Sequence, residues 1–103
     1  MELNSIEEVV EDLKKGKCVV IMDDENRENE GDVICAAEFA TTENVNFMAS
    51  YAKGLICMPM APEYTDKLHL PQMCITNTDN HCTAFSVSVD HVSTTTGISA
   101  YER

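Results

Sequence analysis

Apolar residues near the start of the chain recur at the i, i+3, i+4 and i+7 spacing of one helix face: Ile6, Val9, Val10 and Leu13. Ser5 stands just before this stripe and Glu8 three residues after Ser5, which is the pattern of a capping box. Lys14 and Lys15 suit the negative end of a helix, and Gly16 is a common stop. The pattern predicts a short amphipathic helix that ends at Gly16.

Two apolar runs follow, and each is typical of a strand that is buried on both faces. The first run is Cys18 to Met22 and the second is Val33 to Ala37. The polar stretch between them, Asp23 to Asp32, is therefore expected to form a loop that strands hold at both ends.

A second helix and a third strand are predicted next. Thr41 to Glu43 opens the helix and Gly54 ends it. Its apolar positions keep helical spacing: Val45, Met48, Ala49 and Ala52. Leu55 to Met58 is then expected to be a buried strand that Pro59 stops. Strand, helix and strand in this order favour a right-handed crossover within a mixed sheet.

The rest of the chain predicts less regular structure. Ala61 to Tyr64 fits the start of one helical turn, and the polar stretch from Pro71 to Thr83 fits a long loop. Ala84 to Asp90 alternates apolar and polar residues, as a half-solvated strand does. Ser93 to Ala100 has the pattern of a cap and a first helical turn. The predicted fold class is α+β, a mixed β-sheet with flanking helices in one domain that spans residues 1–103.

Composition narrows the class of protein. With 103 residues, 44% of them apolar and 24% charged, the chain has the size and balance of one soluble globular domain. A net charge of -11 argues against nucleic acid and anionic membranes as partners, because these require clustered Lys and Arg. No stretch has the pattern of a signal peptide or the length of a membrane span, so a cytoplasmic location is expected. The five cysteines are odd in number and never spaced as C-x-x-C, which disfavours a disulfide framework or a zinc site.

The stretch from Asp23 to Asp32 concentrates negative charge. It holds six of the chain's 18 acidic residues, and such crowding costs free energy unless a cation or a ligand offsets it. An EF-hand is rejected, because aligning Gly31 with the invariant glycine places Ala37 where the bidentate Glu belongs. A solvated acidic turn without a role is the remaining simple alternative. Arg27 argues against it, since an arginine among carboxylates lowers their pKa values and is held rigid by them.

The spacing within the loop suggests a metal. In an extended chain, Glu28, Glu30 and Asp32 point to one side and Arg27 to the other. Oxygen ligands on one face, with room for water and substrate, match Mg²⁺ or Mn²⁺ better than a softer metal.

The run from Asp23 to Asp32, DDENRENEGD, resembles nearly letter for letter the signature of the 3,4-dihydroxy-2-butanone 4-phosphate synthase family of riboflavin biosynthesis. Three further blocks resemble the family in the same order: Gly54–Cys57, Thr83–Asp90 and Thr95–Ala100. A ten-residue match with three ordered blocks is highly specific. The resemblance implies the family's α+β fold.

The resemblance also implies a reaction and a set of roles. Family members convert ribulose 5-phosphate into 3,4-dihydroxy-2-butanone 4-phosphate and formate with Mg²⁺ as cofactor, and Mn²⁺ is the alternative ion. Glu28 then corresponds to a metal ligand that also contacts the substrate. Arg27 and Asp32 correspond to residues that hold the sugar phosphate. Asp23 and Glu30 correspond to positions that assist proton transfer or ligand orientation.

Further positions lie outside the loop. Cys57 matches a catalytic position of the family, with a buried strand thiol as the alternative interpretation. Thr95 is expected to contact the substrate at a helix start, although helix capping explains a threonine there equally well. His69, His81 and His91 show no paired spacing and are expected to be surface or loop residues. The resemblance also implies a homodimer with sites near the subunit interface.

Part of the family pattern has no counterpart here. In the family, an Arg-x-Gly-His-Thr segment supplies a histidine ligand to the metal and a later glutamate is needed for catalysis, and neither occurs within residues 1–103. We therefore expect a fold that is incomplete at the C-terminus and a chain that is inactive or nearly inactive alone. The rival hypothesis is a non-catalytic module that binds a metal or a partner through the acidic loop.

Overall fold

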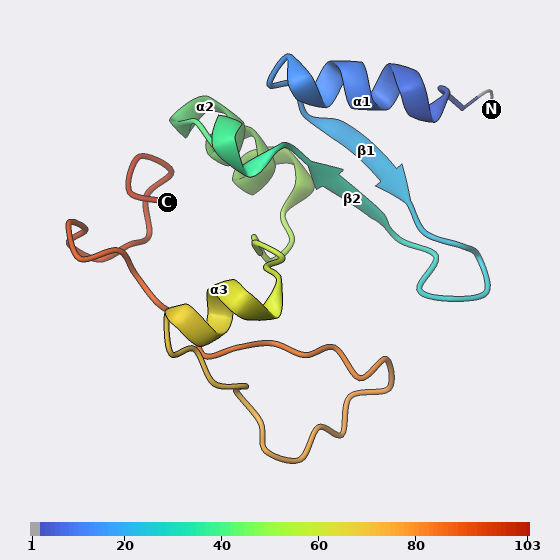
Figure 1. Ribbon diagram of the computed structural model, residues 1–103. Coiled ribbons are helices and arrows are strands. Elements are labelled where there is room, and N and C mark those ends of the chain that lie inside the picture. Colours follow the sequence, from blue (N-terminus) through green and yellow to red (C-terminus); the bar gives the residue numbers. More distant parts are fainter. Residues whose placement is uncertain (1–2) are drawn as a thin grey trace. The chain divides into compact units, whose positions relative to one another are not determined.

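The computed structural model describes residues 3–103. The chain forms two compact units, one from the described part of Met1–Ile56 with Ile98–Arg103 and one from Cys57–Gly97. In the first unit α1, β1, β2 and α2 follow one another, and α3 belongs to the second (Figure 1). No helix within residues 3–103 is long and apolar enough to cross a membrane.

Helix α1 spans Ile6–Lys14 and begins with the predicted capping box. The Ser5 hydroxyl accepts the Glu8 backbone N–H at 3.3 Å, and the Glu8 carboxylate accepts the Ser5 backbone N–H at 2.9 Å. Both bonds satisfy amides that a helix start otherwise leaves unpaired. Gly16 follows with a φ of +76°, a backbone conformation that suits glycine. The prediction of this helix is confirmed.

Strands β1 (Val19–Met22) and β2 (Gly31–Ile34) pair antiparallel over their full lengths. The first predicted strand is confirmed, whereas the second begins at Gly31 and ends before the predicted limit of Ala37. A backbone bond from Asp23 N–H to the Glu30 carbonyl, at 2.9 Å, continues the pairing beyond Met22. The second strand therefore begins as soon as the loop closes, ahead of its apolar run.

The prediction that these strands are buried on both faces is wrong. Val20, Ile21 and Met22 are 66%, 44% and 56% exposed. Within residues 3–103 the sheet consists of two strands, and two strands offer too little surface to cover each other's faces. In that same part of the chain Val45 is the single buried apolar side chain.

The second predicted helix is confirmed, with an irregular second half. After a short 3₁₀ turn, η1 (Ala37–Phe39), helix α2 covers Thr42–Phe47 and one π-helical turn, η2, covers Met48–Ala52. The Thr41 hydroxyl caps the start by accepting the Asn44 backbone N–H at 3.2 Å.

The Asn44 side chain fastens α2 to the turn that follows α1. Its amide nitrogen donates to the Gly16 carbonyl at 3.0 Å and to the Phe39 carbonyl at 2.8 Å. At the other end the helix stops at Lys53, which adopts a φ of +63°, and not at Gly54 as predicted.

Helix α3 (Pro62–Lys67) confirms and lengthens the predicted helical turn of the second unit. The polar stretch after residue 70 is a loop, as expected, with one isolated bridge between Gln72 and Ser86. The α+β class is confirmed by helices that accompany a small antiparallel sheet.

Three predicted elements are contradicted in residues 3–103: residues 55–58 and 84–90 form no strand, and residues 93–100 form turns instead of a helix. The strand–helix–strand crossover is therefore wrong. Apolar runs become strands only beside a partner that accepts their backbone hydrogen bonds, and the bridge at Ser86 is the one pairing here. Gly97 has a φ of +66°, which a right-handed helix does not allow.

Candidate active-site loop

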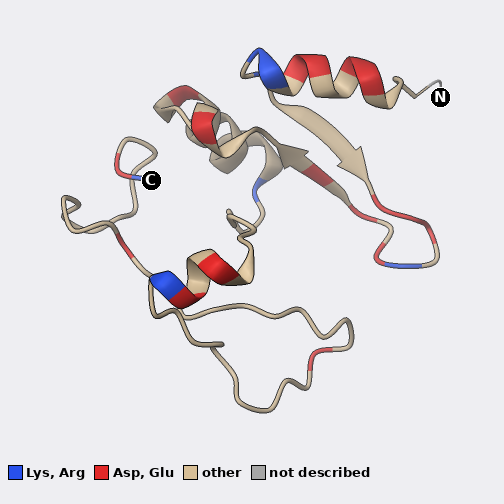
Figure 2. Ribbon diagram, in the orientation of Figure 1, with Lys and Arg blue, Asp and Glu red and all other residues tan. Residues whose placement is uncertain are grey.

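The loop that joins β1 to β2 carries the acidic run. Figure 2 shows acidic residues along this loop with one basic segment among them, and Arg27 is the single basic residue between Asp23 and Asp32. Asp32 lies inside β2, directly opposite Ile21, so the strand pairing fixes the place of its backbone. The loop is therefore held at both ends by two strands that pair with each other and are adjacent in the sequence.

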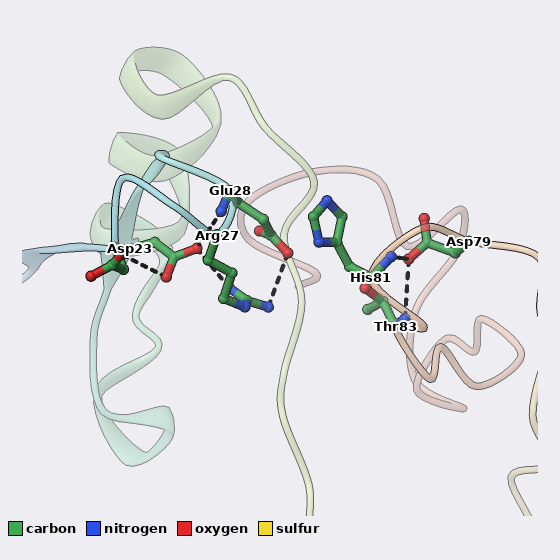
Figure 3. A network of polar contacts seen from close by, with 7 residues as sticks. Asp23, Arg27, Glu28, Asp79, His81 and Thr83 are labelled. Atoms are coloured by element: carbon green, nitrogen blue, oxygen red, sulfur yellow. Dashed lines mark hydrogen bonds and ion pairs between the residues drawn. The ribbon is translucent and has the colours of Figure 1, made fainter.

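Asp23 is the centre of the loop's hydrogen bonding (Figure 3). One carboxylate oxygen, Oδ2, accepts the Arg27 Nη1–H at 2.8 Å and the Glu28 backbone N–H at 3.0 Å. The other, Oδ1, accepts the Asp24 backbone N–H at 2.8 Å. The Glu28 N–H above all, with further help from Asp24 and Arg27, holds the pKa of Asp23 below its ordinary value.

Arg27 lies between two carboxylates. Its Nη2 is 2.9 Å from Glu28 Oε1, while Nη1 is bonded to Asp23 (Figure 3). The hydrogen bond and charge of Asp23, followed by the charge of Glu28, raise the pKa of Arg27. The guanidinium is thereby charged and held in place, although its side chain is 59% exposed.

The expectation that Arg27 and Glu28 point to opposite sides is wrong. The loop is a turn and not an extended strand, because the Asp24 carbonyl accepts backbone N–H groups from Arg27 at 3.0 Å and from Asn29 at 3.3 Å. The Asp24 carboxylate also accepts the Asn26 backbone N–H at 2.8 Å. Consecutive side chains of a turn can converge, and the ion pair between Arg27 and Glu28 is the result.

Asn29 turns the chain back toward β2. Its φ of +53° is the left-handed conformation that asparagine tolerates better than most residues. Gly31 does not have a positive φ, and a Cβ there would meet only Val20 and Met22 at 3.7 and 3.9 Å. The residue that reverses the loop is therefore Asn29 and not Gly31.

Two of the remaining predicted residues, Glu30 and Asp32, lie in the same hairpin as the loop. Glu30 contributes its backbone carbonyl to the strand pairing, and the negative charge of Asp32 makes the smallest of the contributions that raise the pKa of Arg27. Cys57 and Thr95 belong to the second unit. Cys57 is exposed and lies outside any strand, which contradicts the alternative of a buried strand thiol.

A second polar network, in the other unit, was not predicted. Asp79 Oδ2 accepts the backbone N–H groups of His81 and Thr83 at 3.0 and 3.1 Å (Figure 3), and these bonds, with Thr83 the larger contributor, lower the pKa of Asp79. The Asn77 side chain accepts the Asp79 N–H at 2.9 Å and donates to the Thr83 carbonyl at 2.9 Å. The closely spaced Asn and Asp residues of this loop are the sequence signal for such a turn.

This network borders a cavity of about 310 Å³ in the second unit, lined by Gln72, Met73, Cys74, Asn77, Thr78, Asp79, Thr83, Ala84 and Phe85. The three histidines are exposed loop residues, as expected. His91 bonds locally, with Nδ1 2.8 Å from the Ser93 hydroxyl.

The donor set of the acidic loop fits a hard divalent cation in kind. The loop's ligand atoms are carboxylate, amide and carbonyl oxygens, with no cysteine or histidine between Asp23 and Asp32. They do not form a complete cage, because residues 3–103 hold no group of three His, Cys, Asp or Glu side chains placed to bind one ion. This part of the chain supplies a share of the ligands at most.

Together, the fold and the site define an α+β protein with an arginine-centred acidic loop between two antiparallel strands. The family model for 3,4-dihydroxy-2-butanone 4-phosphate synthase matches residues 7–103. The chain belongs to this family of enzymes, as the resemblance of its acidic run implied.

Individual relatives agree with this assignment. The riboflavin biosynthesis protein RibBA of Bacillus mycoides (strain KBAB4) is 60% identical over 98 residues, which are 95% of this chain and 25% of that protein. The chain thus spans about a quarter of the length of the curated relatives it matches.

Solved structures show the same fold. A 3,4-dihydroxy-2-butanone 4-phosphate synthase crystallised with two magnesium ions matches with a TM-score of 0.91 and 51% identity, over 97% of this chain and 47% of that one. RibBX, a two-domain 3,4-dihydroxy-2-butanone 4-phosphate synthase from A. baumannii, matches with a TM-score of 0.86 and 43% identity, over 96% of this chain and 29% of that one.

Proposed function

We propose that this chain supplies the acidic loop of an enzyme that converts D-ribulose 5-phosphate into 3,4-dihydroxy-2-butanone 4-phosphate and formate. The observation that carries the proposal is the arrangement of Asp23, Arg27 and Glu28, in which one carboxylate orders an arginine and a second carboxylate side by side. The family membership of residues 7–103 supports it. The complete enzyme acts in the cytoplasm as a homodimer, with Mg²⁺ as cofactor and Mn²⁺ as a substitute.

Glu28 is the residue of this loop that would hold the metal. A divalent ion, when bound, polarises a carbonyl and stabilises enediolate charge, which enolisation and loss of formate both require. The Glu28 backbone N–H is bonded to Asp23 and its carboxylate to Arg27, so both the main chain and the side chain are oriented before any ligand arrives. Such orientation reduces the ordering that binding must impose.

Arg27 and Asp32 are proposed to hold the sugar phosphate. The Arg27 guanidinium is charged and positioned by Asp23, and over half of its side chain is exposed to an incoming anion. An arginine held in this way binds a phosphate or a sugar hydroxyl with little loss of side-chain freedom. Thr95 is proposed as a further substrate contact from the family resemblance alone.

Asp23 is suited to orient ligands and not to accept protons. Three donors satisfy its carboxylate and its pKa is lowered, so it is a weak base near neutral pH. Of the two possibilities that the sequence left open for Asp23, ligand orientation is therefore the one we propose. Glu30 is proposed to assist proton transfer or ligand orientation, and Cys57 is proposed as a further catalytic residue.

The alternative, a non-catalytic module that binds a metal or a partner, rests on one observation. No group of three ligating side chains gathers in residues 3–103, so this stretch holds a metal only weakly without further ligands. The two hypotheses differ in whether formate appears when the missing ligands are provided.

The test uses this chain completed by the polypeptide that follows it in the relatives, with Glu28→Gln as the variant. Loss of the carboxylate charge should weaken Mg²⁺ binding by at least about 10- to 100-fold and reduce formate release to a similar degree. Glu25→Gln is the matched control, because Glu25 is an acid of the same loop with an exposed side chain. It should retain both properties within about twofold.

The outcomes separate the hypotheses. Unchanged Mg²⁺ affinity and turnover in Glu28→Gln would remove Glu28 as the ligand. Metal binding without formate from the completed protein would favour the non-catalytic module.

A further inference from the structure

Two cysteines meet at the base of the β1–β2 hairpin, at the end away from the acidic loop. The strand register pairs Val19 with Ile34, so its continuation by one residue sets Cys18 opposite Cys35. Both side chains are half-buried, in contrast to the exposed remainder of the set: Cys57, Cys74 and Cys82.

The hydrogen-bond pattern of the hairpin brings these two residues into close approach. The bond from Asp23 N–H to the Glu30 carbonyl marks that pair as hydrogen-bonded. Opposed pairs of an antiparallel ladder alternate between hydrogen-bonded and non-hydrogen-bonded, so Cys18 and Cys35, five positions along, form a non-hydrogen-bonded pair. In such pairs the Cα atoms are about 4.5 Å apart, within the range of about 4.4–6.8 Å that disulfides span.

We propose that Cys18 and Cys35 form an oxidisable thiol pair, a modification site that closes the base of the hairpin as an intrachain disulfide. The bridge would enclose β1, the acidic loop and β2 in one covalent ring. It leaves the loop residues untouched and restrains the two strands that hold them. This proposal stands independently of the proposed enzymatic function.

The chemistry balances with a low-molecular-weight disulfide such as oxidised glutathione as the oxidant. The thiolate of one cysteine attacks the glutathione disulfide, forms a mixed disulfide and releases one glutathione. The thiolate of the second cysteine then attacks the protein sulfur of that mixed disulfide and releases the other. Overall, two protein S–H bonds and the glutathione S–S bond break and one protein S–S bond forms. The two glutathione molecules take up the two protons and the two electrons.

The surroundings of Cys18 make the reaction slow at neutral pH. Burial, followed by the charge and the hydrogen bond of the Cys35 side chain, raises the pKa of Cys18 above its ordinary value of 9.0. Because the thiolate is the reacting form, oxidation should accelerate as pH rises toward and beyond that value. The pair is therefore expected to oxidise slowly and to hold the bridge once it has formed.

The chain contains its own matched control. Cys57 and Cys74 are separated by 17 positions, as Cys18 and Cys35 are, so a chain without the hairpin would close either ring with similar ease. Tryptic cleavage after Arg27 places Cys18 and Cys35 in separate peptides, and cleavage after Lys67 does the same for Cys57 and Cys74. A Cys82→Ser background removes the one other cysteine from the same tryptic peptide as Cys74.

The experiment exposes the full chain in this background to oxidised glutathione, blocks remaining thiols and maps unreduced tryptic peptides by mass spectrometry. In native buffer, the cross-link between Cys18 and Cys35 should exceed that between Cys57 and Cys74 by at least tenfold, and in concentrated urea the ratio should fall toward one. Cys35→Ser should eliminate the favoured cross-link. A native ratio near one, or one that favours Cys57 and Cys74, would overturn the proposal.

Discussion

Asp23 and Glu28 are carboxylates of the same loop, yet their surroundings suit them to different tasks. Asp23 accepts three N–H groups through both oxygens and is half-buried. The Glu28 carboxylate forms an ion pair with Arg27, which a bound cation could rearrange. The sequence identifies both as acids within a family motif. It does not distinguish their tasks, because these depend on which backbone amides the turn directs at each carboxylate.

The first prediction concerns the dependence of this loop on pH. The folded loop lowers the pKa of Asp23 below 3.8, so its hydrogen bonds contribute fully to stability above about pH 5 and are lost as pH falls through 3.8 toward the lower folded value. The Glu28 amide resonance, followed by NMR as pH falls, should report this loss. In Asp23→Asn this change of the Glu28 amide resonance with pH should be absent. If the resonance changed with pH in the variant as it does in the original chain, the change would belong to a group other than Asp23.

At the scale of single residues, the sequence therefore predicts which residues form the acidic loop better than it predicts the directions of their side chains. The structure brings Arg27 and Glu28 together in an ion pair. Their expected separation to opposite sides was wrong, because it assumed an extended chain. The turn follows from the Asp24 carbonyl and from the left-handed Asn29. Neither feature belongs to the two-residue repeat of a strand, so an argument from alternation could not find them.

Among the elements, those stabilised by local interactions were predicted best. Helix α1 carries its own capping box, and α2 has the Thr41 cap and a helical apolar stripe. The β1–β2 hairpin likewise pairs neighbours in sequence. Residues 55–58 and 84–90 have equally apolar patterns but form no strand. A strand depends on a partner whose position local pattern does not reveal.

The turn that ends at Gly97 provides the second prediction. A Cβ at Gly97 would overlap the Asp90 carboxylate, and the φ of +66° already disfavours any other residue. Gly97→Ala should therefore lower the free energy of unfolding of the completed protein by about 1–2 kcal/mol from backbone conformation alone, and by more from the overlap. Chemical denaturation measures the change.

Two further variants separate these causes. In an Asp90→Ala background the overlap is removed, so Gly97→Ala should cost less there, with a coupling of about 0.5–3 kcal/mol. Gly54→Ala is the matched control, because nothing lies within 4 Å of a Cβ at Gly54 and its φ is not positive. Equal costs in both backgrounds would show that Asp90 does not restrict this turn.

At the scale of the molecule, apolar surface is the dominant feature. Within residues 3–103 Val45 is buried, whereas Val20, Leu55 and Val89 are 66%, 79% and 64% exposed. Folding costs about 1–2 kcal/mol of backbone entropy per residue, and burial of apolar surface is the main term that offsets it. With so many apolar side chains exposed, little buried apolar surface remains to offset the cost in backbone entropy. The sequence could not predict this exposure, because a local pattern shows that a residue is apolar but not whether another segment covers it.

The third prediction follows from this exposure and from coverage of 47% of the chain of a solved relative. Alone, the chain should unfold with a shallow denaturant dependence and bind a hydrophobic dye, since little surface is buried to begin with. Adding the polypeptide that completes the domain in the relatives should steepen the unfolding transition, displace the dye and produce formate from ribulose 5-phosphate.

A second copy of the chain is the alternative partner for these exposed apolar side chains. Sedimentation would then show self-association, and the dye would be displaced without the added polypeptide. The Glu28→Gln chain separates folding from chemistry, because it should regain the steep transition with the added polypeptide while producing at least about tenfold less formate. An unchanged transition and undisplaced dye would show that these apolar faces are not where the rest of the domain packs.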